Sequence, residues 1–312
     1  MSYAFVFPGQ GSQSVGMLDA LAEVYPQVEQ TFEEASDALG MDLWQLVSQG
    51  PEEALNRTEN TQPAMLTAAM AVYRVLDSQT NLAPAMMAGH SLGEYTALTA
   101  AGAWSLADAV KLVALRGRLM QQAVPEGAGA MAAILGLEDD AVRELCAEAA
   151  GDQVCEAVNF NSPGQVVIAG DRAAVERAQA LAEARSAKRV VPLPVSVPSH
   201  CSLMKAAAEK LGEALAEVDM CVPEVPVLHN VDAGARDQVD AIRQALVEQL
   251  YRPVLWVDTI LAMKSAGVAQ LFEIGPGKVL TGLNRRIDRR MPITPVFDPA
   301  SVETAVAAME EA

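Results

Sequence analysis

The sequence predicts an α/β fold built on a mostly parallel sheet, with a smaller unit inserted into the chain. Short apolar runs bounded by turn residues alternate with stretches of helical periodicity along most of the 312 residues. One stretch in the middle of the chain follows a different order, β-α-β-β-α-β. About half of the residues are apolar and a fifth are charged, which is typical of a globular chain rather than a disordered one.

The main sheet is expected from four short apolar runs, which are residues 3–7, 85–88, 225–228 and 269–274. Helices are expected over 61–78 and 105–123. Ser105 stands just before Leu106 and Asp108, where a serine side chain typically caps the first turn of a helix. Strands that alternate with helices in this way predict a parallel sheet with helices on both faces.

The middle stretch predicts strands at 131–135, 154–159, 165–170 and 188–193 and helices at 138–150 and 172–185. Asn161-Ser162-Pro163-Gly164 is expected to be the turn between the second and third strands. This order is that of the ferredoxin-like unit. We therefore predict that residues 126–197 form an inserted subdomain and that residues 1–125 and 198–312 form one discontinuous large domain. An active site is expected in the cleft between them.

The net charge of −18 argues against binding to nucleic acid or to an anionic membrane. No apolar run reaches the ~20 residues that a membrane-spanning helix needs. Basic residues do gather locally, at Lys188-Arg189 and at Arg285-Arg286 with Arg289-Arg290. These clusters are candidates for docking an acidic partner.

Cysteine and histidine usage predicts a cytoplasmic protein without a metal site. The four cysteines are scattered and form no C-x-x-C pair, which favours reduced thiols over disulfides or zinc ligation. The chain has three histidines, too few for a histidine-rich metal centre. The first basic residue is Arg57, so the N-terminal apolar run lacks the cationic region of a secretory signal.

A glycine-rich loop, FPGQGSQSVG, follows the first expected strand at residues 7–16. It fails the dinucleotide fingerprint because Ser14 occupies the position of the third glycine. It fails the P-loop pattern because Met17 and Leu18 stand where a lysine and a hydroxyl residue are required. A tight turn explains the glycines equally well at this point.

The motif that carries chemistry is Gly89-His90-Ser91-Leu92-Gly93, a G-x-S-x-G sequence between an expected strand and an expected helix. This is the context of a nucleophile elbow, in which the serine stands on a sharp turn at a helix N-terminus. The amide groups there favour an oxyanion. Ser91 is therefore the candidate nucleophile, and an ordinary strand–turn–helix junction is the alternative.

A serine nucleophile needs a base. His90 is a poor candidate, because neighbouring residues on an elbow point apart. His200, after a proline-rich loop, is favoured over its rival His229, and the alternative for either is a structural histidine. Asp108, Asp152 and Asp171 lie between Ser91 and His200 but resemble caps or surface turn residues, so a Ser–His dyad oriented by a backbone carbonyl is possible. Cys201 is expected to be a small buried side chain rather than a nucleophile.

Several motifs together resemble one family. They run in order over nearly the whole chain and are FPGQGSQ (7–13), GHSLGEY (89–95), RGRLMQ (116–121), NSPGQVVIAG (161–170), VPSHC (197–201), EQLYRPVLW (248–256) and EIGPGKVLTGL (273–283). The chain is similar to the malonyl-CoA:acyl carrier protein transacylases of type II fatty-acid synthesis, which are related to the acyltransferase domains of polyketide synthases. The resemblance implies a hydrolase-like α/β body with an inserted ferredoxin-like subdomain.

The resemblance also implies roles for individual residues. Ser91 is expected to be acylated, with His200 as its general base and acid. The backbone N–H groups of Gln10 and Leu92 are expected to form the oxyanion hole, which gives the glycine-rich loop a purpose. Gln249 is expected to offer its backbone carbonyl to His200, which accounts for the absence of an acidic third member.

Arg116 is implied to hold the free carboxylate of a malonyl group. A guanidinium can grip a carboxylate bidentately, whereas an esterase has no need of a cation in its acyl pocket. Desolvated, such a contact is worth about 2–4 kcal/mol, or roughly 30- to 1000-fold in selectivity over acetyl. A helix-surface role is the default for Arg116 without the resemblance.

The function expected is transfer of malonyl from malonyl-CoA to the phosphopantetheine thiol of acyl carrier protein, in a ping-pong reaction through a malonyl-serine. No metal or other cofactor is expected. The carrier is expected to dock at Lys188/Arg189 or Arg285/Arg286. The alternatives are a serine esterase or thioesterase, an acyltransferase of the same family with another acyl group such as methylmalonyl, and an idle acidic binding protein on this fold.

Overall fold

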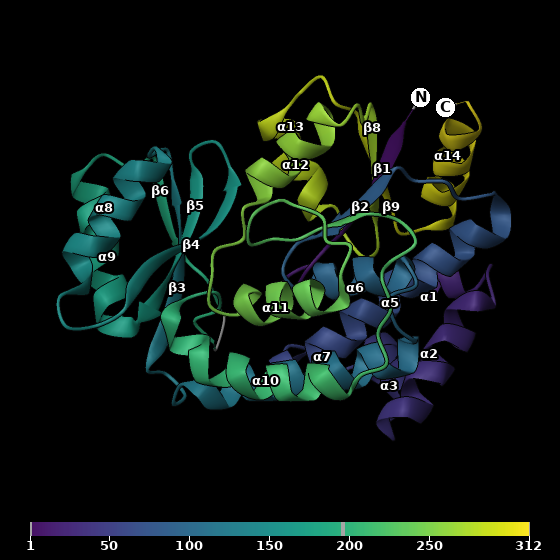
Figure 1. The fold of residues 1–312 in the computed structure, drawn as a ribbon, viewed down its shortest axis with the longest axis horizontal. Helices are drawn as coiled ribbons and strands as arrows, with labels where there is room; N and C mark the ends of the chain where they lie inside the picture. The colour runs from purple at the N-terminus through teal and green to yellow at the C-terminus, as the bar shows by residue number, and fades with distance from the viewer. Residues whose placement is uncertain (1, 195–196, 312) are drawn as a thin grey trace.

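The computed structural model describes residues 2–194 and 197–311 and places their strands in two sheets (Figure 1). The strands are β1 (Tyr3–Phe7), β2 (Met86–Gly89), β3 (Gly129–Leu135), β4 (Cys155–Ser162), β5 (Gln165–Asp171), β6 (Arg189–Pro192), β7 (Val227–Leu228), β8 (Gln270–Ile274) and β9 (Ile293–Val296). Sheet A has the order β7-β2-β1-β8-β9, and its neighbours are parallel. Sheet B has the order β4-β5-β3-β6, and its neighbours are antiparallel. The predicted α/β class with a parallel main sheet is confirmed.

Helices cover both faces of sheet A and one face of sheet B. They are α1 (Asp19–Ala22), α2 (Gln27–Leu39), α3 (Leu43–Gln49), α4 (Glu52–Leu55), α5 (Thr58–Gln79), α6 (Leu92–Ala100), α7 (Leu106–Ala123), α8 (Asp139–Ala150), α9 (Arg172–Ala184), the 3₁₀ turn η1 (Ser202–Met204), α10 (Lys205–Glu217), α11 (Val239–Gln249), α12 (Trp256–Ser265), α13 (Val279–Ile287) and α14 (Pro299–Glu310). The Ser105 side chain accepts from the Asp108 N–H at 3.0 Å, so the predicted cap of α7 is confirmed.

Sheet A separates two hydrophobic cores. Successive side chains of a strand point to opposite faces, and β1 follows this rule. Phe5 and Phe7 join the core that contains buried residues of α2, α5, α6 and α7, whereas Ala4 and Val6 join the core of α12 and α13. Helices on both faces bury β1 completely, which explains why the sequence of this strand is apolar throughout.

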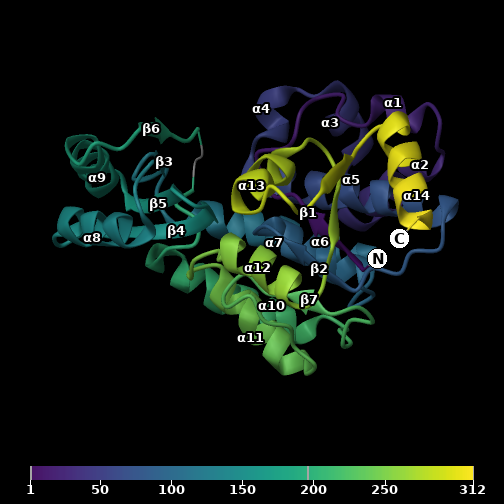
Figure 2. The same cartoon turned by 90° about the horizontal axis from the view of Figure 1, so that it is seen from above.

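Sheet B lies beside the larger part of the molecule. Helices α8 and α9 cover its outer face (Figures 1 and 2). Its inner face packs Met131 and Ala133 with Cys201, which follows the candidate base. Strand β4 also bridges to Val254, five residues after Gln249, and its Glu156 carboxylate accepts from the Ser202 N–H at 3.2 Å. Sheet B therefore supports two segments that reach the candidate site.

Three strands differ from the sequence prediction. β7 is shorter than 225–228 because Pro226 has no N–H to give to the sheet. β4 extends to Ser162, into the turn expected at 161–164, because bulges between Ala157 and Asn159 and near Phe160 bend it without ending its pairing. β9 was not predicted because it contains Pro295, which is tolerated there since β9 lies at the edge of sheet A.

The other expected elements are present with ends shifted by a few residues, and α5 begins at Thr58 rather than at 61. The division of the chain at 126–197 stays a prediction. Sheet B and its helices lie inside these limits, and the proline-rich stretch at their end includes residues 195 and 196, which lie outside the described residues. Among the helices described, none is long and apolar enough to cross a membrane.

Candidate active site

Ser91 stands on the sharp turn between β2 and α6. Its backbone has φ 52° and ψ −106°, a conformation that costs energy for any residue with a side chain. The turn closes because glycines flank it: a Cβ on Gly89 would lie 1.8 Å from the carbonyl carbon of Gly93. A Cβ on Gly93 would lie 2.1 Å from the Phe7 oxygen. The elbow geometry thus explains both glycines of the motif.

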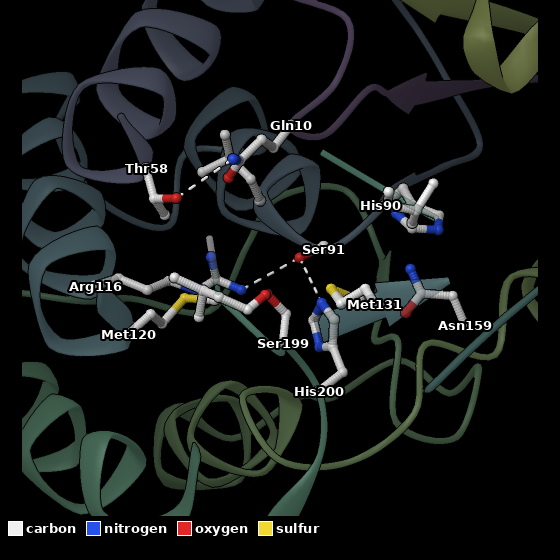
Figure 3. A pocket seen from close by; sticks show the side chains of 13 residues that line it. Gln10, Thr58, His90, Ser91, Arg116, Met120, Met131, Asn159, Ser199 and His200 are labelled. Atoms are coloured by element: carbon white, nitrogen blue, oxygen red, sulfur yellow. Dashed lines mark hydrogen bonds between the residues drawn. The ribbon is translucent and has the colours of Figure 1, made fainter. Parts of the chain in front are cut away.

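A hydrogen-bond chain runs from Ser91 through His200 to Gln249, and Figure 3 shows its Ser91–His200 part. The Ser91 Oγ and the His200 Nε2 are 2.7 Å apart, and the His200 Nδ1 lies 2.7 Å from the backbone oxygen of Gln249. A carbonyl oxygen can only accept, so Nδ1 carries the proton and Nε2 offers its lone pair to the serine hydroxyl. The geometry is that of a serine held by a neutral base.

The imidazole of His200 is held in its neutral form. The side chain is buried, and this burial, with the positive charge of Arg116 as the next cause, lowers the pKa of His200 to about 3. The Gln249 carbonyl acts in the opposite direction but does not cancel them. His200 is therefore ready to accept a proton from Ser91 throughout the neutral range.

Arg116 lies on the other side of Ser91 and is only 1% exposed (Figure 3). Its Nη1 donates to Gln62 Oε1 at 2.8 Å, and its Nη2 donates to Gln249 Oε1 at 3.0 Å and to Ser91 Oγ at 3.3 Å. Its guanidinium carbon lies 5.2 Å from the centre of the Tyr95 ring. Burial lowers the pKa of Arg116, and none of the ion pairs in the described chain includes it. A buried cation held by neutral groups is a receptor for an anion.

A cavity of about 120 Å³ opens over these groups. It is lined by Gln10, Thr58, His90, Ser91, Leu92, Arg116, Met120, Met131, Asn159, Leu193, Val197, Ser199 and His200. The glycine-rich loop reaches it because Gly9 packs on the elbow, where a Cβ would lie 2.5 Å from the His90 oxygen. The Gln10 side chain donates to Thr58 Oγ1 at 3.4 Å, which ties this loop to the start of α5 (Figure 3).

The other candidates from the sequence fall outside the Ser91–His200 chain. His90 lines the cavity, but its Nε2 lies 2.8 Å from Asn161 Oδ1. His229 is buried and donates from Nδ1 to Glu94 Oε1 at 2.8 Å. Cys201 is fully buried and donates its thiol to the Pro198 carbonyl, so it is the small buried side chain that the sequence predicted.

The three acidic candidates also lie outside the hydrogen-bond chain of Ser91 and His200. Asp108 caps the start of α7 with Ser105, and Asp171 accepts from the Val154 N–H at 2.7 Å. Asp152 is exposed. Among the described residues, no group of three or more histidine, cysteine, aspartate or glutamate side chains is suited to hold a metal ion.

The two basic clusters meet at one surface. Lys188, just before β6, and Arg286 from α13 line the same cavity of about 350 Å³, together with Glu138. Arg286 also donates to Gln165 Oε1 of β5 at 2.6 Å. The two basic clusters that the sequence presents as alternatives, Lys188-Arg189 and Arg285-Arg286, therefore lie at one junction between sheet B and α13.

Three residues of the site were not found from the sequence. Gln62 and Glu94 are polar residues inside helical stretches, where they look like surface residues. Asn230 accepts from the Ser91 N–H at 2.8 Å and donates to the Gly89 carbonyl at 2.7 Å, and so holds the elbow from below. Its position next to His229 was the only available signal.

Comparisons with known proteins give the family. The acyl transferase domain family matches residues 4–306. The malonyl CoA-acyl carrier protein transacylase of Escherichia coli K12 is 58% identical over 304 residues, 97% of this chain and 98% of that protein. The one from Bacillus subtilis is 44% identical over 99% of this chain and 97% of its own length.

Solved structures agree with these sequence matches. A malonyl-transacylase in complex with a type II PKS acyl-carrier protein has a TM-score of 0.98 and 54% identity, covering 99% of this chain and 100% of its own. The acyl carrier protein S-malonyltransferase of Vibrio cholerae has a TM-score of 0.96 and 55% identity, covering 98% and 100%. The chain belongs to the malonyl CoA-acyl carrier protein transacylases of the acyl transferase domain family.

Proposed function

We propose that the protein transfers a malonyl group from malonyl-CoA to the phosphopantetheine thiol of an acyl carrier protein, through a malonyl ester of Ser91. The observation that carries this proposal is the buried Arg116 guanidinium beside the Ser91–His200 pair, with Nη2 at 3.3 Å from Ser91 Oγ. A cation so close to a nucleophile suits an acyl group that ends in a carboxylate. The malonyl CoA-acyl carrier protein transacylases among its relatives, and the solved complex of a malonyl-transacylase with an acyl-carrier protein, support it.

In the first half-reaction, Ser91 attacks the carbonyl carbon of the malonyl-CoA thioester. His200 Nε2 takes the proton from the hydroxyl as the new C–O bond forms. The tetrahedral intermediate then collapses, the C–S bond breaks, and His200 returns the proton to the departing sulfur of CoA. The Gln249 carbonyl keeps the Nδ1 proton in place and stabilises the imidazolium while it exists.

The second half-reaction reverses these steps with a different thiol. The phosphopantetheine thiol of the carrier gives its proton to His200 and attacks the malonyl-serine ester. The ester C–O bond breaks, and His200 returns the proton to Ser91. Water would produce malonate if it took the place of the thiol, so transfer requires that the thiol reach the malonyl-serine ester before water does.

The oxyanion of each tetrahedral intermediate is proposed to lie against the backbone N–H groups of Gln10 and Leu92. Both residues line the cavity next to Ser91, and Leu92 is the first residue of α6. An N–H at a helix start has no acceptor within the helix and favours negative charge. Donors fixed by the backbone need no rearrangement when the charge develops.

The serine and the histidine supply every proton transfer in this scheme, and we therefore expect no metal or redox cofactor. A cytoplasmic location is proposed from the four cysteines, all of which are free thiols. The carrier is proposed to dock at the junction of Lys188, Arg189, Arg285 and Arg286. These side chains are exposed, and local positive charge is what a chain of net charge −18 needs to attract an anionic partner.

Intact mass spectrometry after brief exposure to malonyl-CoA tests the proposed intermediate. We expect a malonyl adduct on the unaltered enzyme that disappears when carrier protein is added. Ser91→Ala should give no adduct, whereas Ser265→Ala, which makes the same change at an exposed residue of α12, should keep it. An adduct on Ser91→Ala would refute Ser91 as the nucleophile.

The same experiment separates the alternatives. Steady release of free acid without an adduct would identify an esterase or thioesterase. A competition between malonyl-CoA, methylmalonyl-CoA and acetyl-CoA identifies the acyl group. We expect malonyl to dominate, and a larger methylmalonyl adduct would contradict the proposed substrate.

A further inference from the structure

Glu94 is a buried carboxylate that the mechanism above does not use. It is 0% exposed and lies in the first turn of α6, three residues after Ser91. Three N–H groups converge on it: His229 Nδ1 at 2.8 Å, the Asn230 N–H at 2.9 Å and Gln249 Nε2 at 2.8 Å. A buried carboxylate that accepts only N–H donors acts as a fixed acceptor at the centre of the site.

Gln249 connects this carboxylate to the acyl pocket. Its amide nitrogen donates to Glu94 Oε2 and to the Ser91 backbone oxygen at 2.9 Å, and its amide oxygen accepts from Arg116 Nη2 at 3.0 Å. A side-chain amide can be turned end for end with little change in shape. The turned amide would place its oxygen against the Glu94 carboxylate and its NH₂ group against the Arg116 guanidinium. Both contacts are repulsive, so Glu94, with the Ser91 oxygen and Arg116 itself, fixes which end of the amide faces Arg116, and Glu94 is the charged acceptor among the three.

We propose that Glu94 is a positioning residue for the acyl group: through the Gln249 amide it holds the Arg116 guanidinium in the orientation that receives the malonyl carboxylate. This inference rests on the proposed function. Gln249 then has two separate roles: its backbone carbonyl accepts a hydrogen bond from His200, and its side-chain oxygen accepts one from Arg116. The alternative is that Glu94 only stabilises the fold, as an acid in the first turn of a helix commonly does.

The variant Glu94→Gln tests the proposal, because a glutamine has the same shape but presents a donor as well as an acceptor. Gln249 then keeps the Ser91 oxygen and Arg116 as partners but loses the charged acceptor of its amide nitrogen, so the orientation of the amide is held less strongly. We expect the ratio of malonyl to acetyl kcat/KM to fall about 10- to 100-fold, the usual effect of misplacing a contact by about 1 Å. Glu303→Gln makes the same chemical change on the exposed side of α14 and should leave the ratio unchanged.

A second variant, Gln249→Met, removes the side-chain amide and keeps the backbone carbonyl. If Glu94 acts through this amide, the double variant should lose no more of the ratio than Gln249→Met alone. If the Glu94 charge instead acts directly on the substrate, Gln249 is not needed for its effect. The losses of the two single variants in the malonyl-to-acetyl ratio would then add up in the double variant. The single variant Gln249→Met also tests the proposal without Glu94→Gln. If Gln249→Met has the same malonyl-to-acetyl ratio as the unaltered enzyme, the proposal is overturned even if Glu94→Gln does not fold.

Thermal melting of each variant separates the structural alternative. A purely structural role predicts a lower melting temperature and an equal loss for both acyl groups. An unchanged or increased ratio in Glu94→Gln, or additive effects in the double variant, overturns the inference. The unaltered enzyme tests the proposed function separately. If it forms no malonyl adduct, the proposed function is refuted. If it forms the adduct but Glu94→Gln leaves the malonyl-to-acetyl ratio unchanged, only the role of Glu94 is refuted.

Discussion

Arg116→Met is the perturbation that most directly tests how the acyl group is selected. Methionine fills a similar length of the pocket without charge or donors. Arg116 is 1% exposed, and glutamine oxygens hold both of its terminal nitrogens, so the guanidinium meets a carboxylate without reorganising. A desolvated, charge-assisted contact of this kind contributes about 2–4 kcal/mol. We therefore expect malonyl kcat/KM to fall roughly 30- to 1000-fold relative to acetyl.

The ratio of the two acyl groups is the quantity to measure. Arg116→Met also leaves the Gln62 and Gln249 oxygens without their donor, and this cost applies equally to malonyl and acetyl. Stopped-flow measurement of CoA release, with each thioester as the only donor, gives the two acylation constants. Arg118→Met is the matched control, since Arg118 lies two residues further along α7 and is exposed. A ratio within twofold of the parent in Arg116→Met would show that Arg116 is only structural.

Two further predictions concern charge. The pKa of His200 is 6.5 in the unfolded chain and about 3 in the folded protein. Between these pH values the unfolded chain binds a proton at His200 that the folded protein does not. The free energy of unfolding therefore falls by up to about 1.4 kcal/mol for each unit by which the pH is lowered. His200→Gln should therefore flatten the decline measured by urea titration between pH 6 and pH 4, and equal slopes would contradict the low pKa. Lys188→Glu with Arg286→Glu should slow malonyl transfer to the carrier and reduce its dependence on salt, while leaving CoA release unchanged. Lys111→Glu, on the exposed side of α7, is the control, and an equal loss in both half-reactions would argue against docking at this junction.

Most of the fold was predictable because its elements have strong local patterns. The run at 3–7 is buried on both faces and reads as a strand without ambiguity, and the β-α-β-β-α-β order identified sheet B before its pairing was known. The misses occur where one residue contradicts its surroundings. Pro295 argues against a strand unless the strand is known to lie at an edge, and only the sheet order supplies that fact.

The site was predictable only where a motif carried it. Ser91, His200, Arg116 and Gln249 came from short motifs, and the structure brings these four residues into contact. Glu94 belongs to the same motif as Ser91, yet nothing in its sequence context distinguishes a buried acceptor from a solvated helix residue. Hydrogen-bond partners from distant segments create that distinction, and they are visible only in three dimensions.

The placement of charge around Arg116 explains how the site can keep a buried cation that still binds the carboxylate of an acyl group. A carboxylate in direct contact would satisfy the guanidinium and leave it little reason to bind a second carboxylate. A cation with no acid nearby would carry the full cost of burial. Here Glu94 stands one side chain away, with the Gln249 amide between the two charges. The amide passes part of the stabilisation to Arg116 while keeping the carboxylate out of the acyl pocket, so the pocket stays attractive to an acyl group that brings its own negative charge.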